Sequence, residues 1–226
     1  RSLVKAIKVL QVSWSESQNG LTFFANAFDF NTAVLVTITD ASFANETKVT
    51  ADDVFPRRSQ QGRITVLAGA GIWNGEDSKM SVIGWKSTLI KRVCRSTMKA
   101  ETHAMVAGIE EGSRLRAAVA DARVSQDPKN WEKSSAKVMR HLPVTDCASL
   151  SGYLTNAAKA GCEDKRLEID LEDLRQISWN DENDDPKDDI SIDQHDKVKW
   201  IDTSANLANP LTKEMKPNHL LDTLKT

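Results

Sequence analysis

The feature that most constrains the fold is a change of hydrophobic period at Thr97. Before it, short apolar runs rich in β-branched residues predict three buried strands, over residues 33–38, 63–73 and 80–87. From Thr97 onward, apolar and small residues recur at i, i+3 and i+4, which is the pattern of one helix face. Ser96 or Thr97 is the expected N-cap of that helix.

The remainder of the chain predicts further alternation of strands and helices. In order, a polar crossover covers 121–137, a strand within 141–150 ends on Asp146, helices span 147–154 and 163–177, a strand covers 198–202, and a helix starts at 204. This order predicts one α/β domain with a mixed sheet.

The charge balance and the cysteines exclude several classes of protein. The chain has 30 Lys and Arg against 32 Asp and Glu, a formal net charge of −2, which excludes a globally basic nucleic-acid coat but allows a local basic face. No stretch approaches the roughly 18 apolar residues of a membrane span, so no membrane contact is expected. Three widely spaced cysteines predict a reducing, intracellular compartment, with cytoplasm and nucleus undistinguished.

Three carboxylates are the candidate chemical groups. Asp40 and Asp146 each end a predicted strand, and Glu101 is expected in the first turn of the helix between them. Ligands in open α/β sheets gather beyond the carboxyl ends of strands, and Mg²⁺ prefers oxygen ligands. Two ions about 4 Å apart can activate a water and stabilise the leaving oxygen of a phosphodiester. The alternative is structural, because a strand-end Asp can cap a turn and a first-turn Glu can pair with the helix dipole.

Five segments carry a further signal. They are TDASFA (39–44), SVIGWKSTLIKRVCRSTMKAETHAM (81–105), VTDCASL (144–150), KRLEIDLEDLRQ (165–176) and WIDTSANLANPLTK (200–213). In this order they resemble the RNase H domain of copia-type LTR-retrotransposon Pol polyproteins. The resemblance implies an RNase H-like fold with a mixed five-stranded sheet flanked by helices. It also implies that residues 1–30 are a connector helix and strand from the preceding reverse-transcriptase region, and that 31–226 form the RNase H-like domain, with an acidic loop at 180–196.

The resemblance also implies a ligand set. Asp40, Glu101 and Asp146 would be catalytic metal ligands, for two Mg²⁺ or Mn²⁺ ions if the site is active. The family's fourth carboxylate falls at Asn209, whose amide oxygen can still hold a cation or orient a water, so Asn209 is the expected fourth and weaker ligand. Asn209 before Pro210 also fits an N-cap followed by a first-turn proline, and both interpretations stay open.

Basic side chains crowd the passage from the third strand to the long helix. The candidate nucleic-acid contacts there are Lys86, Lys91, Arg92, Arg95 and Lys99, with the hydroxyls of Ser96 and Thr97. Such groups would neutralise phosphates next to the cut, whereas the alternative is an ordinary solvated loop. Trp85 is expected in the core, and the acidic run at 180–196 is expected to be a solvated, mobile loop that points away from the cleft.

The resemblance implies a metal-dependent endoribonuclease that cuts the RNA strand of RNA–DNA hybrids, attenuated by the amide at Asn209. Its partner would be the reverse-transcriptase portion of the same polyprotein. The alternative is a catalytically decayed or domesticated module, which serves as a structural or binding subunit beside other protein subunits. Metal binding between Asp40, Glu101 and Asp146 distinguishes the two, because a structural module needs none.

Overall fold

A computed structural model describes most of the predicted domain. The described residues are 23, 27–46, 58–125, 127–155, 162, 164–178, 196–213, 215, 220 and 222–223. The predicted connector over 1–30 lies outside them, apart from residues 23 and 27–30, and so does the acidic run apart from Asp196. None of the described helices combines the length and the apolar character that crossing a bilayer requires.

Five strands form one mixed sheet, as predicted. They are β1 (Val34–Glu46), β2 (Arg58–Ala68), β3 (Met80–Leu89), β4 (His141–Thr145) and β5 (Lys199–Trp200). The strand order is β3-β2-β1-β4-β5. β1 pairs antiparallel with β2, and β2 with β3, whereas β4 runs parallel to both β1 and β5.

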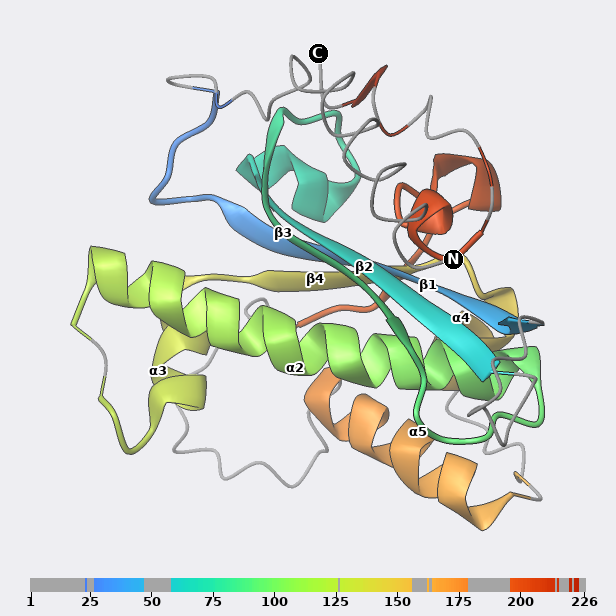
Figure 1. The fold of residues 1–226 in the computed structure, drawn as a ribbon. Coiled ribbons are helices and arrows are strands. Elements are labelled where there is room, and N and C mark those ends of the chain that lie inside the picture. Colours follow the sequence, from blue (N-terminus) through green and yellow to red (C-terminus); the bar gives the residue numbers. More distant parts are fainter. Residues whose placement is uncertain are drawn as a thin grey trace, which may run out of the picture.

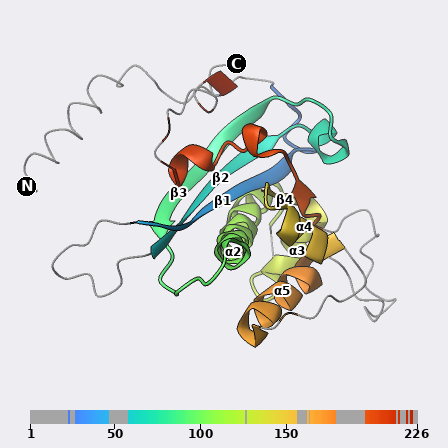
Figure 2. The ribbon, with the colours of Figure 1, turned by 90° about the vertical axis from the view of Figure 1, so that its right-hand side faces the viewer.

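Helices cover one face of this sheet and short 3-10 turns cover the other (Figure 1). The helices are α2 (Thr97–Arg123), α3 (Trp131–Val138), α4 (Ala148–Thr155) and α5 (Lys165–Ser178). The turns are η1 (Ala70–Asn74), η3 (Thr203–Ala205) and η4 (Asn209–Leu211). Figure 2 shows α2 end-on beneath the sheet and the C-terminal turns on the opposite side.

Both faces of the central strand are therefore buried. Val34, Val36 and Ile38 of β1 pack beneath the C-terminal turns, while Leu35, between them, packs on the α2 side. A strand buried on both faces has no need of polar alternation, which explains why apolar residues dominate its first half. On α2, Gly112 permits close approach to the sheet, because a Cβ there would overlap the ring of His141.

Several boundaries differ from the predictions. β1 continues beyond Asp40 to Glu46, and the expected strand over 63–73 starts earlier and gives way to η1 after Ala68. The polar crossover contains α3. The terminal helix expected from residue 204 is instead η3 and η4, because Asn206 bonds its amide to Thr39 O at 3.0 Å and accepts a hydrogen bond from Ala208 N at 2.9 Å. These side-chain bonds replace helical ones.

Two burial predictions are wrong. Trp85 is 61% exposed on β3, which is an edge strand of the sheet that the described residues form. Asp196, expected in the solvated acidic loop, is 7% exposed, and its carboxylate accepts a 2.6 Å hydrogen bond from Arg116 of α2. The acidic run therefore ends on a buried ion pair.

Candidate metal centre

The parallel pairing of β1 and β4 brings two of the predicted carboxylates to one place. The last paired residues of the ladder are Ile38 and Val144. Two residues further along each chain, Asp40 and Asp146 lie at the same end of the pair. Asp40 is within β1, still opposite Gly62 of β2, and Asp146 directly follows β4, so only Asp146 ends its strand as expected.

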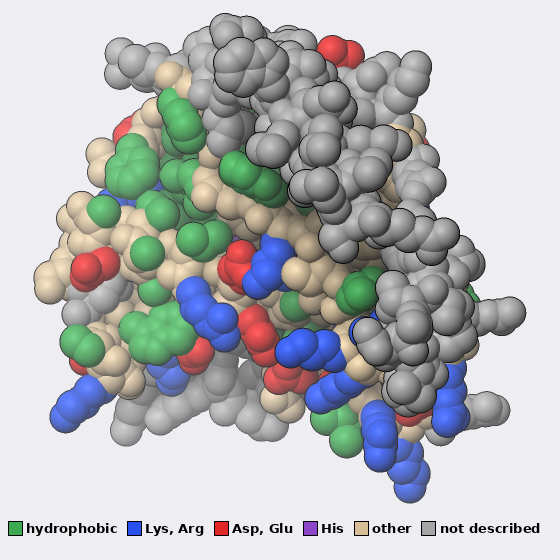
Figure 3. Space-filling model, viewed as in Figure 1, with side chains coloured by type: hydrophobic (Ala, Val, Ile, Leu, Met, Phe, Trp, Pro, Cys, Tyr) green, Lys and Arg blue, Asp and Glu red, His purple; other side chains and the backbone are tan. Residues whose placement is uncertain are grey.

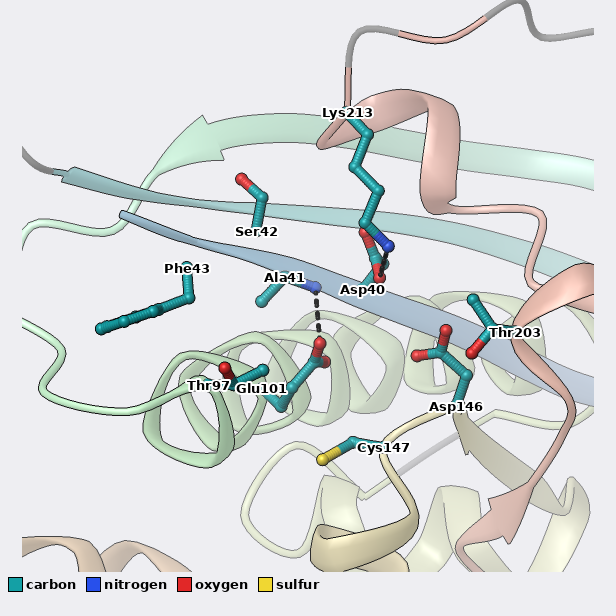
Figure 4. A pocket seen from close by; sticks show the side chains of 10 residues that line it. All are labelled: Asp40, Ala41, Ser42, Phe43, Thr97, Glu101, Asp146, Cys147, Thr203 and Lys213. Atoms are coloured by element: carbon teal, nitrogen blue, oxygen red, sulfur yellow. Dashed lines mark hydrogen bonds and ion pairs between the residues drawn. The ribbon is translucent and has the colours of Figure 1, made fainter. Parts of the chain in front are cut away.

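Glu101 completes the cluster from the opposite side. It is the fifth residue of α2, one turn later than predicted, and α2 lies against β1 at this point. One carboxylate oxygen from each of Asp40, Glu101 and Asp146 lies within 4.8 Å of the others. They line a pocket together with Ala41, Ser42, Phe43, Thr97, Cys147, Thr203 and Lys213 (Figure 4).

The environment of Glu101 favours a cation. Its Oε1 accepts a 3.3 Å hydrogen bond from the Ala41 backbone N–H, but its buried Oε2 has no hydrogen-bond partner among the described residues. Burial raises the pKa of Glu101 to about 8, and the nearby Asp40 and Asp146 add to that rise. A buried carboxylate beside two others is costly unless a positive charge offsets it, and oxygen ligands suit Mg²⁺ or Mn²⁺. The residues present therefore fit a divalent ion.

Asp40 has two partners from the C-terminal segment. The Thr212 hydroxyl donates to its Oδ2, and Lys213 Nζ donates to its Oδ1 at 3.1 Å. Burial raises the pKa of Asp40 in spite of these bonds, which act in the opposite direction. The ammonium of Lys213 thus contacts the most buried carboxylate of the cluster.

Asn209 lies beside this contact rather than in the pocket. Its amide Nδ2 donates to Thr203 O at 2.7 Å, and its Oδ1 accepts from Lys213 Nζ at 2.5 Å. The residues that line the pocket do not include Asn209. The N-cap position of η4 is Ala208, so Asn209 is the first residue of the turn and Pro210 follows it.

Thr212 and Lys213 are the site residues that the sequence predictions missed. Both end the segment WIDTSANLANPLTK (200–213), in which Asn209 is the predicted site residue. The available signal was a lysine four residues after a candidate ligand. Where the Lys213 side chain points depends on how η4 packs against β2, and the local sequence does not show this packing.

The predicted nucleic-acid contacts divide into two groups. Lys91, Arg92 and Arg95 are exposed on the loop between β3 and α2, and the Lys86 side chain is 51% exposed. Figure 3 shows Lys and Arg side chains gathered over this loop and the neighbouring α5, at the lower right of the view. Two long ion pairs involve this group among the described residues. Arg92 NH1 lies 3.9 Å from Asp170 Oδ2, and Lys86 Nζ lies 4.0 Å from Glu111 Oε2.

The remaining three lie at the start of α2. Ser96 is the N-cap, and its hydroxyl accepts from Lys99 N at 3.2 Å. Of the two predicted caps, Ser96 and Thr97, the structure therefore has the first. Thr97 lines the pocket. Lys99 departs from its prediction: it is 8% exposed, and its ammonium bonds to Asp164 at 2.7 Å, so it joins α2 to the start of α5 rather than facing solvent.

No protein-family model matches the chain, and no curated protein matches its sequence. Among solved structures it is similar to the N-terminal RNase H domain of a Mycobacterium tuberculosis protein, at 12% identity and a TM-score of 0.42, covering 85% of this chain and 96% of that one. It is similar to RNase H1 of Halobacterium salinarum at 14% identity and a TM-score of 0.42, with coverages of 83% and 98%. It is also similar to the compost-derived LC11-RNase H1, solved with an RNA/DNA hybrid, at 13% identity and a TM-score of 0.47, covering 82% of this chain and 99% of that one.

Proposed function

We propose that this chain is a metal-dependent endoribonuclease module that cuts the RNA strand of RNA–DNA hybrids. The observation that carries the proposal is the convergence of Asp40, Glu101 and Asp146 within 4.8 Å, from three segments far apart in sequence. The unpartnered, buried Glu101 Oε2 supports a cation there. The five family-like segments further suggest an origin in a copia-type Pol polyprotein, with its reverse-transcriptase portion as partner.

The three carboxylates would hold Mg²⁺ or Mn²⁺. When bound, such an ion supplies Lewis-acid stabilisation of phosphate charge and lowers the pKa of water. Asp40 and Asp146 hold their oxygens on the sheet side of the pocket, and Glu101 faces them from α2 (Figure 4). Ala41 N–H fixes the orientation of the Glu101 carboxylate.

The exposed cations of the β3–α2 loop fit the substrate. Lys91, Arg92 and Arg95 directly precede α2, whose second turn carries Glu101. Cations at that place would contact phosphates next to the pocket without reading sequence. An A-form-like duplex presents 2′-hydroxyls in a wide, shallow minor groove, which is how a hybrid is told from DNA.

A second candidate function is a decayed or domesticated module that binds partners without cutting. The observation that favours it is the contact of Lys213 Nζ with Asp40 and Asn209, because an ammonium already offsets part of the carboxylate charge. In this case other protein subunits would be the partners.

The two candidates are separated by cleavage of a labelled RNA–DNA hybrid in Mg²⁺ and, separately, in Mn²⁺. We expect cutting by the parent chain and loss of at least 100-fold in Asp40→Asn, which removes a charged ligand but keeps the shape. The matched control is Asp173→Asn, an exposed acid on α5, which should cut at the parent rate. No cutting by the folded parent in either metal would favour the decayed module, and undiminished cutting by Asp40→Asn would contradict the site.

A further inference from the structure

We propose that the ammonium of Lys213 is a built-in second cation, so that this pocket binds one divalent ion rather than two. The inference rests on the proposed function, because it concerns the same carboxylates. It assigns Lys213 as a residue that sets the ion count of the site.

The position of the ammonium is that of a ligated cation. Lys213 Nζ lies 3.1 Å from Oδ1 of the predicted ligand Asp40 and 2.5 Å from Oδ1 of Asn209, the residue expected as the fourth and weaker ligand. The Asp40 side chain is 1% exposed, whereas that of Lys213 is 38% exposed, so the lysine reaches the carboxylate from the open side. A second ion on these oxygens would first have to displace the ammonium.

The segment that presents Lys213 is anchored to the sheet. Leu211 O accepts hydrogen bonds from Ser87 Oγ at 2.5 Å and from Gln60 Nε2 at 3.1 Å. At Gly62 of β2 a Cβ would lie 2.7 Å from Leu211 Cβ, so the absence of a side chain there lets η4 settle onto the strand. The ammonium is therefore placed by packing and not only by attraction to Asp40.

The charge balance agrees with a single ion. Asp40, Glu101 and Asp146 carry three negative charges when ionised, and Lys213 leaves two, which one divalent ion neutralises. Two divalent ions would leave an excess of one positive charge if the ammonium were displaced and of two if it stayed, in a pocket whose ligands are mostly buried, which is unfavourable. The neutral amide of Asn209 supplies an oxygen that accepts from the ammonium, and it adds no negative charge that a second divalent ion would have to neutralise.

The test counts bound ions and does not depend on cleavage. Mn²⁺ binding to the full chain is followed by electron paramagnetic resonance of free Mn²⁺ and by calorimetry. We expect one ion per parent chain, and two in the double variant Asn209→Asp with Lys213→Met, which restores a carboxylate and removes the ammonium. Lys213→Arg, which keeps the positive charge, should stay at one ion, as should the control Lys91→Met on the exposed loop.

The single variant Lys213→Met separates a charge role from a merely structural one. Removal of a positive charge that contacts a proposed ligand, Asp40, should tighten the first Mn²⁺ at least tenfold, because repulsion between nearby like charges is large in a partly buried site. If Lys213 only held Asp40 in place, the same change would weaken binding. Circular dichroism establishes that each variant is folded.

The outcomes distinguish the inference from the proposed function. Two ions on the parent chain, weaker binding by Lys213→Met, or a double variant that still takes one ion would each overturn the inference and leave the nuclease proposal standing. No ion on the parent and none on the folded Lys213→Met variant would overturn the proposed function itself.

Discussion

Glu101 sits where its negative charge is poorly stabilised, at 5% exposure and facing Asp40 and Asp146. Its pKa is raised from 4.5 to about 8. Between these two pH values the folded chain holds a proton that the unfolded chain has released. The free energy of unfolding therefore falls as the pH rises from 4.5 to 8 when no ion is bound.

Glu101→Gln should remove this dependence, because the amide does not ionise and its oxygen can still accept from Ala41 N–H. In excess chelator at pH 8 the variant should be more stable than the parent by on the order of 4–5 kcal/mol, given about 1.4 kcal/mol per pKa unit and the rise of the Glu101 pKa from 4.5 to about 8. At pH 4.5 the two should be equal. Urea unfolding at both pH values measures the difference, with the exposed Glu110→Gln as control. Equal stabilities at pH 8 would contradict the burial argument.

A second buried charge pair lies on the far part of α2. Arg116 and Asp196 are 5% and 7% exposed, and Asp196 Oδ1 also accepts from His141 N at 3.2 Å. His141 itself is buried with a pKa lowered to about 3, by burial first and then by Arg116, so it stays neutral and shares a 2.9 Å hydrogen bond with Thr37.

Arg116→Leu should destabilise the chain by about 3–5 kcal/mol, because it breaks a buried ion pair by removing one of its two charges. Arg114→Leu is the matched control on the same helix: the Arg114 side chain is 70% exposed, and among the described residues its ion pair is with Glu110, at 4.0 Å. That control should change stability by no more than about 0.5 kcal/mol. Thermal or urea unfolding of both variants measures the two changes in stability. Similar losses of stability in the two variants would show that burial of the Arg116–Asp196 pair is unimportant.

At the scale of elements, α2 is the piece that joins the sheet to the site. Its first turns bring Glu101 to the pocket, and its middle lies close to the sheet at Gly108 and Gly112. A Cβ at Gly112 would overlap the fully buried His141 ring, whereas a Cβ at Gly152 of α4 would meet nothing within 4 Å. Close packing of α2 against His141 therefore requires glycine at position 112, whereas the space around Gly152 would accept a larger residue.

Gly112→Ala and Gly152→Ala should change stability in opposite directions. The first should destabilise by about 1–3 kcal/mol, as overpacking does in a close-packed interior. The second should stabilise by roughly 0.5–1 kcal/mol, because Ala has the better helix propensity and α4 has room for it. Differential scanning calorimetry of the pair tests this, and a stabilising Gly112→Ala would contradict the close approach of α2.

Elements with a strong periodic pattern could be predicted from the sequence, whereas those decided by distant partners could not. The run through Ile38 and the stripe that starts at Thr97 are local signals, and both elements are present. The C-terminal turns depend on the hydrogen bond from Asn206 to Thr39 O, 167 residues away. The burial of Lys99 depends on its ion pair with Asp164, 65 residues away. In the site, three carboxylates could be proposed from their strand and helix positions, but the contact between Lys213 and Asp40 required the packing of η4.

At the scale of the whole molecule, the net charge of −2 coexists with a local basic loop beside the pocket. The loop carries Lys91, Arg92 and Arg95, all exposed. Long-range repulsion of a duplex by the rest of the chain would be screened at physiological salt, where the Debye length is about 8 Å. Contacts made directly by the loop would survive.

Substitution of Lys91, Arg92 and Arg95 together by Ala should weaken hybrid binding and flatten its salt dependence. Each lost phosphate contact reduces the slope of log K against log salt by about 0.9, so the triple variant should lose between about 1 and 3 in slope. A matched triple variant on α3 and its approach, Lys129, Lys133 and Lys137 to Ala, keeps the same net charge change away from the pocket. Fluorescence anisotropy at several salt concentrations measures both, and equal slopes in the two would contradict the placement of the substrate.

The distance along the chain between Asp40 and Lys213, 173 residues, sets an order of events during synthesis. Ribosomes add about 5–20 residues per second, so roughly 10–35 s separate the emergence of the carboxylate from that of its ammonium. The strand hairpin β1–β2 is complete long before its charged partner exists. A nascent chain therefore passes through a stage in which Asp40 must remain solvated or protonated, because the residues that bond to its carboxylate are translated more than 170 positions later.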